Sequence, residues 1–119
     1  MAKASEDGPD QLDRLLSQVG PGVAGQLLAQ LVQDLGGVAR GLAAALPLAD
    51  RDAVRRQTHI LTGLAGTLGA HALLADALAL NAAAHDPARP LPADLGPRLT
   101  AGLDRLIAGI TDRQTGIGG

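Results

Sequence analysis

Apolar residues recur every three or four positions through most of the chain, and this spacing is that of an amphipathic α-helix. The spacing is clearest between residues 22 and 46, where it is carried by Leu28, Leu31, Leu35, Val38, Leu42 and Leu46. Pro47 then ends the segment, because proline interrupts the hydrogen bonding of a helix. No segment alternates apolar and polar residues as a half-buried strand does. The sequence therefore predicts an all-α fold.

Proline, glycine and capping residues divide the chain into five predicted helices. In chain order these are Pro9 to Gly20, Gly22 to Leu46, a third helix capped by Asp50 and running to about Gly69, Ala70 to His85, and Leu95 to Asp112. Residues 9–112 make one predicted domain, between a disordered N-terminus (1–8) and a flexible tail (113–119). Because the connections are short, we expect an antiparallel up-down four-helix bundle with an additional short N-terminal helix packed across one end.

Composition excludes several classes of function. The chain has no cysteine, so no disulfide, thiolate metal site or cysteine nucleophile is available. A formal net charge of −2 and the lack of any aromatic residue argue against nucleic-acid binding. The polar, acidic N-terminus does not resemble a signal peptide, and no apolar run reaches the length of a membrane span. We therefore expect a cytoplasmic protein that contacts neither nucleic acid nor membrane.

The predicted third helix has two different faces. One face holds the core candidates Val54, Leu61, Leu64 and Leu68. The opposite face is a strip formed by Arg55, Arg56, His59, Thr62, Gly63, Gly66 and Ala70. His59 lies at the centre of this strip, so we expect its imidazole to be exposed to solvent.

Two interpretations of the glycines in the strip stay open. A glycine inside a helix costs roughly 1 kcal/mol relative to alanine, and an exposed position offers no packing to offset this cost. Gly63 and Gly66 therefore suit a surface where a partner approaches the backbone beside His59. Alternatively they reflect composition, since the chain holds 16 glycines and places Gly36 and Gly109 in other predicted helices.

The stretch from Thr58 to Ala70 has the sequence Thr-His-Ile-Leu-Thr-Gly-Leu-Ala-Gly-Thr-Leu-Gly-Ala. It resembles the signature of histidine-containing phosphotransfer (HPt) domains, which runs His-x-Leu-Lys-Gly-x-Ala-Gly-x-Leu-Gly-Ala. The resemblance extends from about Leu12 to Leu106, with Asn81 at the place of the family's glutamine or glutamate. The family fold is a four-helix bundle, in agreement with the helical spacing.

The resemblance implies that His59 takes a phosphoryl group from an aspartyl phosphate on one receiver domain and passes it to an aspartate on another. The implied partners are response-regulator receiver domains and a hybrid sensor kinase, and we expect a monomer. A neutral imidazole nitrogen is a good nucleophile at neutral pH. Catalysis of phosphoryl transfer is mostly positioning plus positive charge, and in this family Mg²⁺ and a lysine come from the receiver. The resemblance thus implies no cofactor bound by this chain.

Thr62 departs from the family pattern, which has a lysine there beside the phosphoryl oxygens. Arg55 and Arg56 lie one turn before His59 on the same face, so they are candidates to supply the missing charge. Two interpretations of Asn81 stay open, a side-chain hydrogen bond that steadies the imidazole or a solvated position at the rim.

Other candidate sites and functions are weaker. His71 and His85, at the two ends of the predicted fourth helix, are interpreted as solvated, because neither has a second ligand at metal-binding spacing. Besides an active phosphocarrier, the sequence allows a non-catalytic HPt-like module that binds a receiver or kinase without transferring phosphate. It also allows a purely structural helical adaptor. Retention of His59 favours the phosphocarrier.

Overall fold

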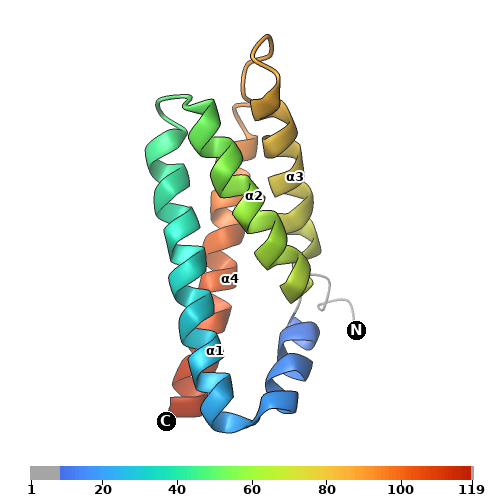
Figure 1. Ribbon diagram of the computed structural model, residues 1–119, viewed down its shortest axis with the longest axis vertical. Helices are drawn as coiled ribbons and strands as arrows, with labels where there is room; N and C mark the ends of the chain where they lie inside the picture. The colour runs from blue at the N-terminus through green and yellow to red at the C-terminus, as the bar shows by residue number, and fades with distance from the viewer. Residues whose placement is uncertain (1–8, 119) are drawn as a thin grey trace.

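The structure is a computed structural model that describes residues 9–118, and all regular secondary structure in this range is helical. It contains α1 (Pro9–Ala45), α2 (Arg51–Leu68), α3 (His71–His85) and α4 (Leu95–Gly118). Successive helices run in opposite directions, and each packs on its neighbour in the chain while α4 returns to pack on α1 (Figure 1). The all-α prediction is confirmed for the described residues. The predicted disordered segment 1–8 lies outside them.

Helix α1 covers the first two predicted helices, with a kink where the sequence predicts a break. Gly20 has φ 81° and ψ 161°, a backbone region open essentially to glycine alone. Pro21 follows, and its ring disfavours a helical conformation at the residue before it while suiting the first position of a new helix. The chain therefore reverses at Gly20, and the residues before it form a short helical arm.

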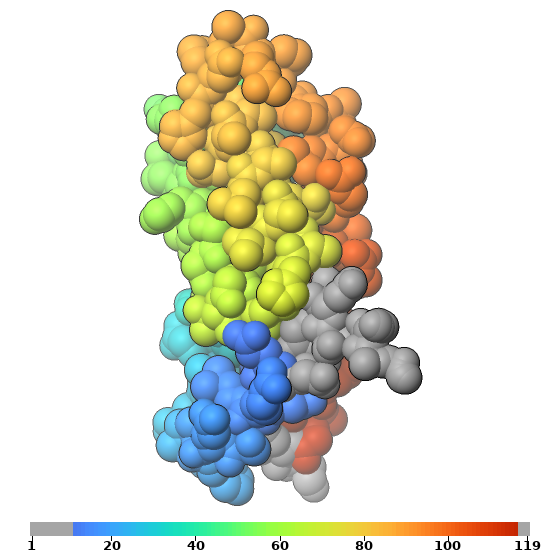
Figure 2. Space-filling view, turned by 90° about the vertical axis from the view of Figure 1, so that its right-hand side faces the viewer, coloured from blue at the N-terminus to red at the C-terminus, as the bar shows by residue number. Residues whose placement is uncertain are grey.

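The arm lies beside the ends of α2 and α3, as the blue segment below the green and yellow helices in Figure 2 shows. Leu12 is buried there, and Gln11 donates a side-chain hydrogen bond of 2.6 Å to the carbonyl oxygen of Thr67. Asp13 forms an ion pair with Arg113 of α4 at 2.7 Å. The arm is thus held to two helices far from it in the sequence.

The ends of α2 follow from local chemistry. The Asp50 carboxylate accepts a hydrogen bond of 3.1 Å from the backbone N–H of Ala53, which confirms the predicted N-cap. At the other end Gly69 adopts a left-handed conformation with φ 72°, and its N–H donates to the last turn of the helix. Ala70 is therefore outside α2 and buried, so its predicted place on the exposed strip is wrong.

The core is made of aliphatic side chains from all four helices. Its largest fully buried members are Leu28, Leu35, Leu42, Leu61, Leu68, Leu80, Leu99, Leu103, Ile110, Val38, Val54 and Thr58. Leu64, predicted as core, is half-buried at its margin.

Helix α4 does not end at Asp112 as predicted. Of the predicted flexible tail (113–119), residues 113–118 continue the helix, and Gly119 lies outside the described residues. Arg113 explains part of the difference, because its guanidinium binds Asp13 of the arm and also donates to the carbonyl oxygen of Gly109.

Candidate functional site

His59 is exposed near the middle of α2, as the helical projection predicts. The core side of the same helix holds Val54 and Leu61, both fully buried. Packing on that side fixes the rotation of α2 about its axis. The imidazole is consequently presented to solvent by a helix whose opposite face is anchored in the core.

A shallow hollow of about 420 Å³ adjoins His59 between α2 and α3. Helix α2 contributes Asp52, Arg55 and Arg56 beside His59, and α3 contributes Asn81 and His85. Two guanidinium groups thus share the hollow with one carboxylate. This excess of positive charge suits an anionic ligand.

The two arginines of the hollow differ in their partners. Arg55 is half-buried and forms an ion pair with Asp52, one turn earlier on α2. Arg56 is exposed, and no ion pair forms at this side chain within the described part of the chain. Arg56 is therefore the guanidinium that a new anion can bind without displacing a carboxylate.

Thr62 is half-buried and lies outside this hollow. Its hydroxyl donates a hydrogen bond of 2.8 Å to the backbone carbonyl oxygen of His59. The side chain thus caps a carbonyl of its own helix. It brings no charge to the surface where the family has a lysine.

Asn81 joins α3 to α2 directly behind His59. Its side-chain amide donates to the hydroxyl of Thr58 at 2.9 Å and to the carbonyl oxygen of Arg55 at 3.2 Å. Thr58 is fully buried, and its hydroxyl in turn donates to the carbonyl oxygen of Val54 at 2.8 Å. The amide nitrogen of Asn81 is thus bound to α2 rather than to the imidazole of His59, while the half-exposed side chain also lines the hollow.

His85 is a member of the site that the sequence interpretation missed. Its Nδ1 lies 2.9 Å from the carbonyl oxygen of Asn81, and its ring lines the same hollow as His59. The spacing of four residues between Asn81 and His85 puts both on one face of α3. That spacing was visible in the sequence, but the pairing of this face with α2 was not.

The exposed surface beyond His59 is open. A Cβ atom added at Gly63 or at Gly66 would meet no atom within 4 Å. On α3, Leu78 is 54% exposed and lies one turn before Asn81, which binds α2. Ile60, the residue after His59, is 47% exposed. The imidazole thus stands on a surface with glycine backbone and apolar side chains around it.

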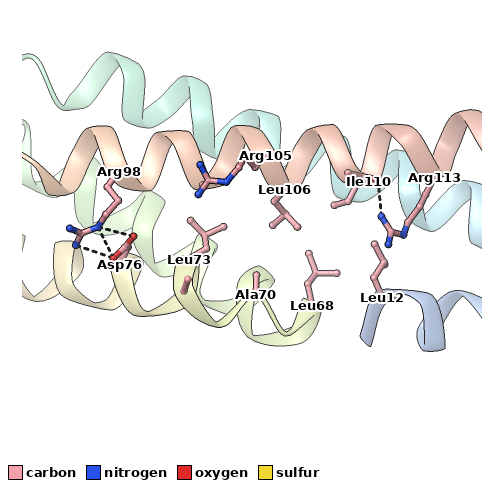
Figure 3. Close-up of a pocket in the computed structure, with 13 residues that line it drawn as sticks. Leu12, Leu68, Ala70, Leu73, Asp76, Arg98, Arg105, Leu106, Ile110 and Arg113 are labelled. Atoms are coloured by element: carbon pink, nitrogen blue, oxygen red, sulfur yellow. Dashed lines mark hydrogen bonds and ion pairs between the residues drawn. The ribbon is translucent and has the colours of Figure 1, made fainter. Parts of the chain in front are cut away.

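A second, separate groove of about 320 Å³ runs between the arm, α3 and α4 (Figure 3). Its floor is apolar, and Arg98 at its edge is bound to Asp76. Of the strip predicted from the sequence, only the buried Ala70 lines this groove. It is therefore not part of the surface around His59.

Among residues 9–118, no cluster of three or more histidine or acidic side chains could hold a metal ion. Within the same range, no helix has the length and apolar character needed to cross a membrane.

The described residues form an all-helical bundle that displays His59 at the middle of a helix anchored in the core. The family model of the Hpt domain matches residues 26–109 of this chain. The chain therefore belongs to the Hpt domain family, whose members act in two-component phosphorelays and interact there with receiver domains and kinases. Comparison with curated proteins and with solved structures returned no match.

Proposed function

We propose that this chain is a phosphorelay intermediate in which His59 carries a phosphoryl group between receiver-domain aspartates. The observation that carries the proposal is the exposed imidazole of His59 on a helix fixed by its buried face, in a chain of the Hpt domain family. The protein acts in the cytoplasm, where receiver domains and a hybrid sensor kinase are its partners.

The transfer uses the imidazole as a nucleophile. A neutral ring nitrogen of His59 attacks the phosphorus of an aspartyl phosphate on the receiver, so an N–P bond forms while the P–O bond to the aspartate breaks. The aspartate leaves as a carboxylate. Attack by the aspartate of a second receiver reverses the two bond changes and returns His59 to its neutral form. In both directions, catalysis depends mainly on positioning the attacking and leaving atoms in line with the phosphorus.

Positive charge near the carried group comes partly from this chain. Arg56 is exposed beside His59 and has no ion pair among the described residues, so its guanidinium is available to the phosphoryl oxygens. Arg55 is held by Asp52 and contributes less. Arg56 therefore supplies part of the positive charge that the family's lysine provides at the position of Thr62. The receiver supplies the rest together with its Mg²⁺.

The surface around the imidazole accommodates the receiver. Gly63 and Gly66 leave the backbone of α2 uncovered, and Leu78 and Ile60 offer apolar contact on either side. Exposed large apolar side chains beside a functional group are typical of an interaction surface. The receiver can thus bring its aspartate down to His59 without displacing side chains of the bundle.

The test is phosphoryl transfer from a panel of receiver domains labelled with radioactive acetyl phosphate. We expect label to appear on the wild-type chain and on His71→Ala, which removes an exposed histidine outside the hollow. His59→Gln should take up no label while keeping the wild-type melting temperature, because an exposed side chain contributes less than about 0.5 kcal/mol. If receivers bind the wild-type chain without labelling it, the chain is a non-catalytic binding module. Label on another residue would refute the site.

A further inference from the structure

The hollow beside His59 contains a second imidazole whose hydrogen-bonding state is fixed by the fold. The carbonyl oxygen of Asn81 can only accept a hydrogen bond, so Nδ1 of His85, 2.9 Å away, must be the donor. In the neutral ring Nε2 then carries a lone pair and no proton. No other hydrogen bond of His85 forms among the described residues. Nε2 is therefore the atom left for a further ligand.

The directions of the two helices bring the two imidazoles together. Side chains on a helix lean toward its N-terminus. Helices α2 and α3 run in opposite directions (Figure 1). The general lean therefore directs the side chain of His59 toward the start of α2 and that of His85 toward the start of α3. Asn81 lies between them on α3, bound to α2 at Thr58 and Arg55. The two rings thus face a common space, and both line the hollow.

We propose that His85 is a phosphate-binding residue, which as an imidazolium donates a hydrogen bond from Nε2–H to the phosphoryl group carried by His59. The inference rests on the proposed phosphocarrier function. Nδ1–H keeps its bond to Asn81, and the proton taken up on Nε2 comes from solvent. No bond to phosphorus forms or breaks at His85. The charge that Thr62 does not supply on α2 is supplied from α3, and it is present only while the ring is protonated.

The charged neighbours of His85 are consistent with a site that becomes cationic when an anion is present. From α2, the hollow holds Asp52, Arg55, Arg56 and His59. Asp52 is bound to Arg55, whereas Arg56 has no ion pair among the described residues. Arg51 of α2 is a further cation near His85, and its guanidinium donates to the backbone carbonyl oxygens of Ala83 and Asp86. Asp86 follows His85 in the chain, and its carboxylate accepts the backbone N–H of Ala88. A phosphoryl group on His59 is then the new negative charge that favours protonation of His85.

The first measurement follows the histidine rings by nitrogen-15 NMR in the full chain, with phosphoramidate as a direct donor to His59 so that no receiver is needed. On phosphorylation of His59 we expect the nitrogen-15 signal of His85 Nε2 to change to that of a protonated nitrogen that donates a hydrogen bond. The signals of His71, at the other end of α3, should stay unchanged. An Nε2 signal of His85 that is the same with and without the phosphoryl group overturns the proposal.

The second measurement is the partition of label between the chain and a phospho-receiver. His85→Ala should shift label toward the receiver by about twofold to fivefold relative to His71→Ala, its matched control. His85→Gln should recover part of this loss without the pH dependence, because a side-chain amide donates whatever the pH. Absence of label on wild-type His59 would count against the proposed function. If wild-type His59 is labelled but His85→Ala and His71→Ala partition the label equally, only the role of His85 is refuted. Label on His85 itself also refutes it.

Discussion

Replacing Gly63 and Gly66 by alanine separates the two interpretations of the glycines beside His59. Neither new methyl group would meet an atom of the bundle within 4 Å, so the substitutions cost no packing. Each removes the conformational penalty of a helical glycine, which is about 0.8 to 1 kcal/mol. We therefore expect each single variant to be more stable by this amount, and the double variant by about 1.5 to 2 kcal/mol.

The expected gain in the free energy of unfolding can be expressed as a rise in melting temperature by means of the entropy of unfolding. A domain of about this size unfolds with an entropy of roughly 0.25 kcal/mol/K, so each kcal/mol raises the melting temperature by about 4 °C. The double variant should melt about 6 to 8 °C above wild type in circular dichroism at the helical wavelengths. Gly109→Ala is the matched control. Its Cβ makes only an ordinary contact with Arg113 at 3.7 Å, and it lies on α4, which does not pack on α2.

Transfer from a phospho-receiver should change in the opposite direction. If the receiver approaches the backbone of α2, a methyl group at Gly63 or Gly66 displaces it by a distance comparable to 1 Å, which costs about tenfold to a hundredfold in rate. Gly109→Ala should gain stability and keep its rate. If the two variants beside His59 gain stability and also transfer at the wild-type rate, then these glycines reflect composition only. A loss of stability would show that this helix face is not open.

Four other substitutions test single contacts. Asn81→Ala removes two hydrogen bonds between α3 and α2 and should cost about 1 to 2 kcal/mol in urea denaturation, whereas a neutral effect would mean the contact contributes nothing. Hydrogen bonding from Arg113, aided by its charge, lowers the pKa of Asp13. The ion pair therefore stabilises the fold at neutral pH, and this contribution is lost as the pH falls through the lowered pKa. Asp13→Asn should cost under about 1 kcal/mol at pH 7 and nothing at a pH where the Asp13 carboxyl group is protonated. Gly20→Ala should cost about 1 to 3 kcal/mol, because its backbone conformation is closed to alanine; a cost below 0.5 kcal/mol, on the order of an ordinary surface change, would contradict the kink. Thr62→Lys should shift label toward the chain by about twofold to fivefold, less at high salt, and no shift at either salt concentration would show that charge there is irrelevant.

Helix boundaries were predictable wherever one residue decides them locally. Asp50 caps α2 through its own side chain, and Gly20 with Pro21 breaks α1 through backbone sterics. The end of α4 was not predictable in this way. The glycines after Asp112 favour a flexible tail, but the contact of Arg113 with Asp13 joins residues 100 positions apart, and no local pattern reveals it.

In the candidate site too, the features set by local sequence were predictable and those set by contacts between helices were not. The exposure of His59 followed from the helical projection of α2 alone, because the buried side is strongly apolar. The neighbours that α3 brings to it, Asn81 and His85, depend on how that helix is rotated against α2. Asn81 shows the consequence, since its partner is a buried threonine hydroxyl that no spacing rule connects to it. The role of His59 as the phosphoryl carrier itself stays a prediction.

The exposed position of Leu78 is suited to a tryptophan that reports receiver binding by its fluorescence. The sequence contains no tryptophan, tyrosine or phenylalanine, so the chain has almost no near-ultraviolet absorption or intrinsic fluorescence. Leu78 is 54% exposed and lies one turn before Asn81 on α3. A tryptophan placed there would be the sole fluorophore, and its emission would change as a receiver covers it. Binding could then be followed in real time in His59→Gln, where no phosphoryl transfer interferes, without attaching a dye to either protein.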